Sequence, residues 1–199
     1  TESSISDING EKGILSYRGY SIEELAEKST FEETALLLLT GELPTTEELS
    51  KFTKQINSRR DLPSGMIDLL KTLPKDSNPM DVIQLAVSSL GTFYPITFDA
   101  EELKAKKYNK EYYIEVSAGI IGSIGSIVAA WNRIKNIYDY IKPDPNLSYA
   151  ENFMHMLDDS IKVTPLISRI IDATLILHAE HTINASTFTS MVTSSTLAS

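Results

Sequence analysis

The hydrophobic and polar positions of the chain follow a helical period over most of its length. In the N-terminal third, three apolar segments each begin with a hydroxyl residue three positions ahead of a glutamate, at Ser21, Thr30 and Thr45. Such a hydroxyl accepts a hydrogen bond from the first helical turn, while the glutamate reaches back to the cap amide. Gly41 and Pro44 then predict the end of the second segment. We therefore expect three short helices in succession.

The same start and stop signals predict further helices along the chain. Proline, glycine and capping residues bound helical segments at residues 64–73, from 79 to about 90, at 111–140, at 149–157 and from 165 onward. The stretch Gly91–Phe98, rich in aromatic residues, is expected to interrupt this pattern. The charged run Glu101–Lys110 has the composition of a solvated face or loop.

Strand-like patterning is confined to the N-terminus. The pair Asn9-Gly10 is a strong signal for a two-residue turn, and short apolar segments flank it. We expect one small hairpin there and no other β structure. The predicted fold class is therefore all-α: mostly helical, with one small N-terminal β-hairpin.

Three small residues, Gly119, Gly122 and Gly125, lie three positions apart in the longest predicted helix. Glycines at this spacing let another helix approach closely. The partner is either a helix of the same chain or a helix of a second subunit, and the pattern favours neither. The surrounding sequence is no phosphate-binding loop, because it lacks the Lys-Ser/Thr ending and a preceding strand.

Composition narrows the functional classes. The chain has 199 residues, a net charge of −9 and no cysteine. An acidic chain argues against a nucleic-acid surface, and the absence of cysteine excludes disulfides and thiol chemistry. The apolar run Val116–Trp131 is about 16 residues long, short of the ~20 that a membrane helix needs. The start of the chain is polar and carries no signal-peptide pattern, so we expect a cytoplasmic protein that binds neither nucleic acid nor membrane.

Candidate chemistry concentrates near the C-terminus, in the stretch His178–Thr187, which holds two of the three histidines. On a helical wheel His178 shares a face with the apolar residues before it, which predicts a buried, structural histidine. His181 lies at the edge of that face, and Asn184 and Ser186 follow it. A histidine, an amide and a hydroxyl at this spacing can bind carboxylate or keto oxygens.

Two other chemistries fit the stretch poorly. The histidines are three residues apart, whereas the zinc-protease helix has them four apart with glutamate directly after the first. Glu180 instead precedes the second histidine and points elsewhere on the wheel. There is also no Gly-x-Ser-x-Gly elbow for a serine nucleophile. We expect neither a metal site nor a cofactor.

Nearly the whole chain resembles a known family. Four motifs stand in order with intact spacing: residues 7–22, residues 32–44, Leu147–Phe153 and Leu175–Thr187. Together they resemble the N-terminal half of a citrate synthase of bacterial or archaeal type. The resemblance implies condensation of acetyl-CoA with oxaloacetate to citrate and CoA, or of propionyl-CoA in a 2-methylcitrate synthase.

The resemblance also implies an architecture. Members are nearly all-helical homo-oligomers built on dimers, some of them hexamers, with a large and a small domain. Residues 1–199 would form the N-terminal part of the large domain, without the small domain and the remaining large-domain helices. A different class of protein also stays open: a non-catalytic, truncated helical module that dimerises or binds a carboxylate.

Site residues follow from the resemblance position by position. His181 matches the family histidine that binds oxaloacetate, Asn184 lies in the same substrate-binding segment, and Ser186 matches a residue that supports the catalytic histidine. The catalytic histidines and aspartate of the family would lie beyond Ser199, so we expect no catalytic residue and no activity in this chain alone. Met191 departs from the family, where arginine is common.

Overall fold

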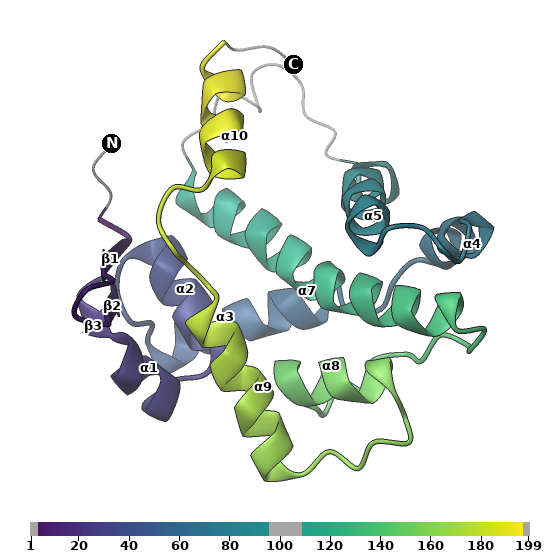
Figure 1. The fold of residues 1–199 in the computed structure, drawn as a ribbon, viewed down its shortest axis with the longest axis horizontal. Coiled ribbons are helices and arrows are strands. Elements are labelled where there is room, and N and C mark those ends of the chain that lie inside the picture. Colours follow the sequence, from purple (N-terminus) through teal and green to yellow (C-terminus); the bar gives the residue numbers. More distant parts are fainter. Residues whose placement is uncertain (1–3, 96–108, 197–199) are drawn as a thin grey trace. The chain divides into compact units, whose positions relative to one another are not determined.

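The chain folds into helices and one small sheet that group into two units (Figure 1). The computed structural model describes residues 4–95 and 109–196, and within them the predicted all-α class is confirmed. One unit comprises Thr1–Pro44 with Ile170–Ser199, and the other comprises Thr45–Arg169. The helices are α1 (Ile22–Lys28), α2 (Phe31–Thr40), α3 (Thr46–Asn57), α4 (Ser64–Thr72), α5 (Pro79–Phe93), α7 (Lys110–Lys135), α8 (Tyr149–Leu157), α9 (Pro165–Leu177) and α10 (Ala185–Ser195).

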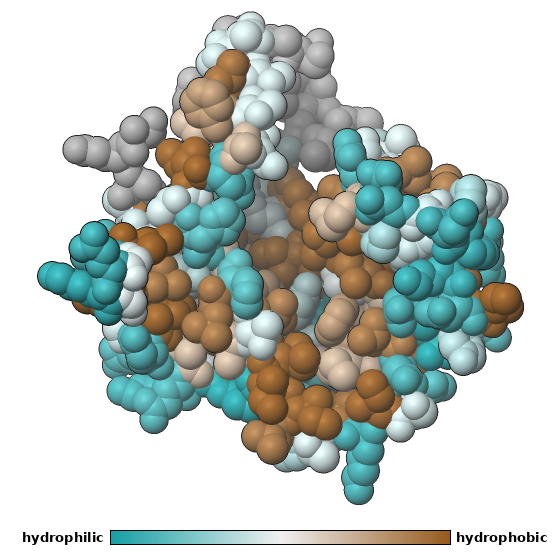
Figure 2. All heavy atoms as spheres, in the orientation of Figure 1, coloured by the Kyte–Doolittle hydropathy of each residue, from teal (hydrophilic) through white to brown (hydrophobic). Residues whose placement is uncertain are grey.

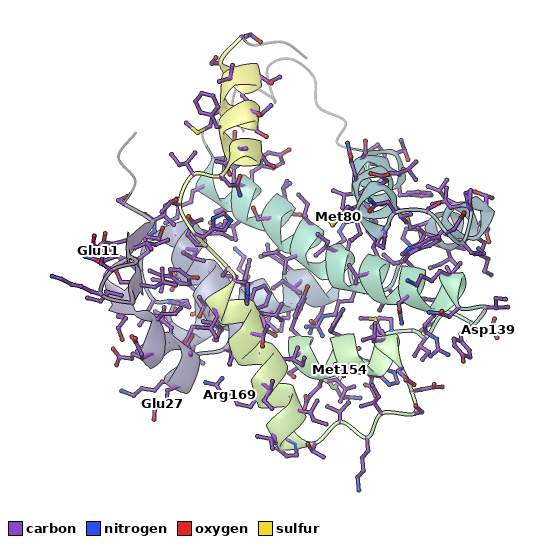
Figure 3. All side chains as sticks on the ribbon, in the orientation of Figure 1. Glu11, Glu27, Met80, Asp139, Met154 and Arg169 are labelled. Carbon is purple, nitrogen blue, oxygen red and sulfur yellow. The ribbon has the colours of Figure 1, made fainter. Side chains whose placement is uncertain are left out.

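The first unit begins with a three-stranded antiparallel sheet, β1 (Ser6–Asn9), β2 (Ile14–Tyr17) and β3 (Tyr20–Ser21), in that order. The hairpin is confirmed, but the two-residue turn was wrongly placed. Asn9 pairs with Ile14, so four residues form the turn. The Asn9 side chain accepts from the Lys12 amide at 3.0 Å, which favours this longer turn. Glu11, at its tip, is exposed (Figure 3).

A two-residue turn does occur, one strand later. Tyr17 pairs with Tyr20 across Arg18 and Gly19, whose φ angles are 51° and 89°. Two positive φ angles are the signature of the type I′ turn that matches the twist of paired strands. The third strand was not predicted because only two residues form it.

The hydroxyl caps of α1 and α2 are present as predicted, but their glutamates do not close the capping boxes. Thr30 Oγ1 accepts from the Glu33 amide at 3.2 Å, while the Glu33 carboxylate accepts from Ser29 Oγ at 2.6 Å. In α1 the Glu24 carboxylate pairs with Lys28 at 3.1 Å. Each glutamate therefore bonds a neighbouring side chain instead of the backbone amide of the N-cap residue. The predicted box is complete at the starts of α3 and α8.

The core of the first unit joins its two sequence segments. Tyr17, Ile22, Leu25 and Leu37 pack with Ile176 of α9, and all five side chains are buried. Burying large apolar side chains contributes about 1.5–3 kcal/mol each. Ile176 therefore attaches α9 to the sheet and to the first two helices.

The second unit is built on α7, which contacts α3, α5 and α8. By length and composition alone, this 26-residue helix could cross a membrane, because it extends beyond the apolar run Val116–Trp131 at both ends. Nine of its residues are buried, including Ile127, Trp131 and Ile134, which lie in a core cluster with α4 and α5. These contacts identify α7 as the core helix of the unit.

Some predicted boundaries were wrong. α5 continues through Gly91 to Phe93, so the expected interruption begins later. α7 ends at Lys135, five residues early, and the chain then passes through Ile137 with a φ of 65°. Residues 96–108, which hold most of the charged run, lie outside the described residues.

The glycine stripe of α7 contacts helices of its own chain. A methyl group on Gly122 would overlap the backbone carbonyl oxygen of Ile56 in α3. At Gly125 it would lie 3.0 Å from the Tyr149 hydroxyl, which itself donates to the Ile121 carbonyl at 2.8 Å. The stripe is therefore an internal contact, which decides between the two partners that the spacing left open.

Substitution of two glycines in α7 tests this contact. We expect Gly122→Ala to lower the free energy of unfolding by about 1–3 kcal/mol, because the Ile56 carbonyl cannot move aside. Gly119→Ala is the matched control, since its methyl would meet only the Arg59 side chain at 3.6 Å. The control gains up to about 1 kcal/mol from helix propensity. Urea unfolding measures the free energy of unfolding of both variants. Equal values for the two would contradict the internal contact.

Candidate functional site

The candidate residues lie on the connection between α9 and α10. α9 begins where predicted, with Thr164 Oγ1 accepting from the Ile167 amide at 3.3 Å. It ends at Leu177, and a second helix, α10, follows Asn184. That second helix was not predicted. Residues 178–184 therefore form a short segment between two helix ends rather than part of one long helix.

The prediction that His178 is buried was wrong. The residue lies just beyond the end of α9 and is exposed, with Nδ1 2.8 Å from the Thr174 carbonyl oxygen. The face of α9 that packs within the first unit carries Asp172 and Ile176 instead. Asp172 accepts from the Phe31 amide at the start of α2 at 2.9 Å, and Ile176 is fully buried. Asp172 and Ile176 therefore lie on the packed face of α9, which the apolar periodicity did not predict.

A buried tyrosine fixes the start of the segment. The Tyr17 ring is completely buried, and its hydroxyl lies 3.1 Å from the Ile176 carbonyl, 3.4 Å from that of Leu177 and 3.0 Å from that of Glu180. The same hydroxyl accepts from the Glu180 amide at 3.2 Å. Two of these carbonyls belong to the last turn of α9, and that of Ile176 also accepts from the Ala179 amide at 3.2 Å.

The pKa of the Tyr17 hydroxyl is raised above its ordinary value, chiefly by burial. The hydrogen bond to the Glu180 backbone opposes this shift, and the charge of the Glu180 side chain adds to it. The hydroxyl therefore keeps its proton well into the alkaline range and remains a donor. Tyr17 was not predicted to be a site residue, although it lies in a motif that supports the family resemblance.

The carboxylate of Glu180 fixes the next turn of the segment. Its Oε1 accepts from Ser6 Oγ of β1 at 3.3 Å and from the Thr182 amide two residues later. Thr182 has a φ of 77°, in the left-handed region that a β-branched residue rarely adopts. The carboxylate contact to its amide helps to hold it in this conformation.

His181 stands between these two anchored residues. Its side chain is exposed, and no hydrogen bond or ion pair involves its ring within the part of the chain that the structure describes. The backbone on both sides of the ring is fixed by these contacts to Glu180 and Thr182, while the ring itself is exposed. This is an arrangement in which a ligand can supply the missing partner.

Asn184 is the N-cap of α10. Its Oδ1 accepts from the Thr187 amide at 2.7 Å, and Ser186 lies exposed in the first turn of the helix. His181, Asn184 and Ser186 thus share one segment and one helix start, as the spacing suggested. The first amides of α10 also make its start favourable for an anion.

Within the part of the chain that the structure describes, no cluster of metal-binding side chains lies at this segment. Among residues 4–95 and 109–196, no three His, Cys, Asp or Glu side chains come together to hold a metal ion; the predictions of no metal and no cofactor stay predictions. A cavity of about 650 Å³ lies in the second unit, where the Arg59 guanidinium stacks 3.9 Å from the Tyr94 ring centre. Its lining includes no residue of His178–Thr187.

Substitution of Asn184 separates its capping role from any ligand contact. Asn184→Ala removes the cap and is expected to lower the stability of α10 by about 1 kcal/mol. Asn184→Asp keeps the accepting oxygen, adds favourable charge at the helix start and preserves α10, but it removes the amide donor. Amide hydrogen exchange over residues 185–195 measures the helix. Faster exchange in the aspartate variant than in the alanine variant would contradict the cap.

Comparison with known proteins shows which family this chain resembles. The family model described as "Citrate synthase, C-terminal domain" matches residues 1–199. The chain is 44% identical over 197 residues to a citrate synthase of Acidithiobacillus ferridurans, covering 99% of this chain and 50% of that protein. It is 39% identical over 199 residues to a 2-methylcitrate synthase of Corynebacterium glutamicum, again covering 50% of the relative.

Solved structures agree with the sequence relatives. The crystal structure of citrate synthase from Pyrobaculum aerophilum aligns with a TM-score of 0.83 at 35% identity, covering 100% of this chain and 49% of the other. Citrate synthase from Thermotoga maritima aligns with a TM-score of 0.79. The chain spans about half the length of the curated relatives it matches. The match to the family model over residues 1–199 establishes that the chain belongs to the citrate synthase family.

Proposed function

We propose that the complete protein containing this chain is an acyltransferase that condenses acetyl-CoA with oxaloacetate and water to give citrate and free CoA. Within it, His181 binds oxaloacetate as a hydrogen-bond donor. The observation that carries this assignment is the exposed His181 ring, without a protein partner in the described residues, between the anchored residues Glu180 and Thr182.

The start of α10 supports the same substrate. Oxaloacetate carries two carboxylates, and a helix N-terminus favours negative charge through its unpaired amides. The Asn184 side chain contributes an amide group at this position, with its oxygen already occupied by the cap. Ser186 follows in the first turn, where the family resemblance gives it a supporting role toward a catalytic histidine. In this proposal the segment forms the part of the active site that binds the carboxylates of oxaloacetate, and the NH₂ group of Asn184 is one of its donors.

The chemical steps rest on groups that the resemblance places beyond Ser199. A carboxylate removes a proton from the acetyl methyl group while a histidine stabilises the enolate oxygen. The enolate carbon then attacks the keto carbon of oxaloacetate, and hydrolysis of the thioester releases CoA. In this scheme His181 orients the acceptor, and orientation of this kind lowers the barrier by several kcal/mol. The 199-residue chain alone is expected to be inactive.

A second candidate uses propionyl-CoA and forms 2-methylcitrate. The relative from Corynebacterium glutamicum, named as a 2-methylcitrate synthase, favours this alternative at 39% identity. Both reactions share the oxaloacetate site and differ in the acyl pocket. Turnover of the two thioesters by the complete protein separates them. A protein that condenses neither would be the non-catalytic module.

The proposed assembly is a homo-oligomer, at least a dimer, in the cytoplasm, without cofactor, nucleic acid or membrane. Exposed apolar side chains on α10 support association, since Phe188, Met191 and Val192 are 59%, 51% and 49% exposed. Figure 2 shows apolar residues on the surface of this helix. Apolar side chains gathered on one helix are costly to leave in water. Met191, where relatives often carry arginine, makes this helix more apolar.

Replacing His181 tests the proposed role. His181→Ala in the complete protein is expected to raise the KM for oxaloacetate about 10- to 150-fold, the effect of losing one hydrogen bond to a charged group. The KM for acetyl-CoA should stay within a factor of two. His178→Ala is the matched control, because that ring contacts the Thr174 carbonyl instead. An unchanged KM in the first variant, or an equal rise in both, would overturn the assignment.

A further inference from the structure

We propose that Tyr17 and Glu180 are positioning residues that set the orientation of His181 toward its ligand, an inference that rests on the proposed function. Neither touches the ligand in this account. They act through the backbone on either side of His181, and they connect the N-terminal sheet to the ligand segment. The contacts that carry the inference all lie within the first unit.

The Tyr17 hydroxyl links the end of α9 to the residue before His181. It lies within 3.1 Å of the carbonyls of Ile176 and Glu180, and it accepts from the Glu180 amide. Both backbone groups of Glu180 therefore meet one buried oxygen atom. The peptide that joins Glu180 to His181 begins at one of these groups, so its plane is set by Tyr17.

The Glu180 side chain acts on the other side of His181. Its Oε1 accepts from the Thr182 amide, which places the carboxylate across the backbone of His181. Ser6 Oγ, 3.3 Å from the same oxygen, fixes the carboxylate to β1. His181 is thus bracketed: Tyr17 holds the residue before it, and the Glu180 carboxylate holds the residue after it.

The hydrogen bonds of the Tyr17 hydroxyl differ in kind from the apolar contacts of its ring. The core already joins Ile176 to the Tyr17 ring through apolar contact, which Tyr17→Phe retains. The hydroxyl adds hydrogen bonds of fixed direction to these apolar contacts. Its partners lie in the segment that carries His181. A displacement near 1 Å of a group that positions a substrate can cost about 100-fold in rate, so directional bonds here affect binding strongly.

The test uses Tyr17→Phe in the complete protein, with Tyr20→Phe as the matched control. Tyr20 packs against the same core, and its hydroxyl makes no hydrogen bond among the described residues. We expect Tyr17→Phe to weaken oxaloacetate binding about 5- to 30-fold by calorimetry, with an equal rise in KM. The acetyl-CoA KM should change less than twofold, and amide exchange at residues 180–182 should accelerate. Tyr20→Phe should leave the oxaloacetate affinity, both KM values and the amide exchange unchanged.

Glu180 supplies a second, independent variant if Tyr17→Phe unfolds the protein, which circular dichroism would detect. Glu180→Ala should weaken oxaloacetate binding by a similar factor, whereas Glu180→Gln, which retains an accepting oxygen, should recover most of it. Rescue by glutamine distinguishes a positioning bond from a general need for side-chain volume. An equal loss in both Glu180 variants would overturn the inference.

The outcomes separate the inference from the proposed function. Wild-type protein that binds no oxaloacetate, or His181→Ala that binds it normally, refutes the proposed function and the inference with it. Normal binding by folded Tyr17→Phe, together with impaired binding by His181→Ala, refutes the inference alone. A fall in kcat with unchanged oxaloacetate binding in Tyr17→Phe also refutes it, because positioning through His181 acts on the bound acceptor.

Discussion

A single buried hydroxyl organises the part of the chain that carries its candidate chemistry. The Tyr17 oxygen meets carbonyls from the last turn of α9 and both backbone groups of Glu180. Because the Tyr17 ring is buried, its hydroxyl is held where it meets these backbone groups. The end of α9 and the residue before His181 are therefore both held by one residue of the N-terminal sheet.

Local signals predicted the helices because helix ends depend on residues that are close in sequence. Thr45, Ser148 and Asn78 each cap a helix within three residues of themselves, so their patterns could be recognised directly. The same logic failed for α10, which begins with Asn184 but has threonine, not glutamate, three positions on. A cap without its partner glutamate carries too little information to identify a helix of serines and threonines.

The site could be predicted by residue type but not by geometry. The spacing of His181, Asn184 and Ser186 pointed to one segment, and the structure places the three residues along it. The wheel misplaced His178, because it assumed that α9 continues through that position. The Tyr17 hydroxyl that contacts the end of α9 is 159 residues away in sequence from Ile176, and Asp172 accepts from an amide 141 residues away. The periodicity of a local sequence pattern cannot reveal contacts between residues so far apart in the chain. The family resemblance suggested roles for the site residues but did not reveal these contacts.

The first unit is discontinuous in sequence, and this affects the order in which it folds. Its sheet and first two helices leave the ribosome before residues 45–169, whereas their partners Ile176 and Glu180 come after. The second unit is a continuous stretch and can assemble during this interval. The ligand segment can therefore acquire its structure only after residues 45–169 have been synthesised.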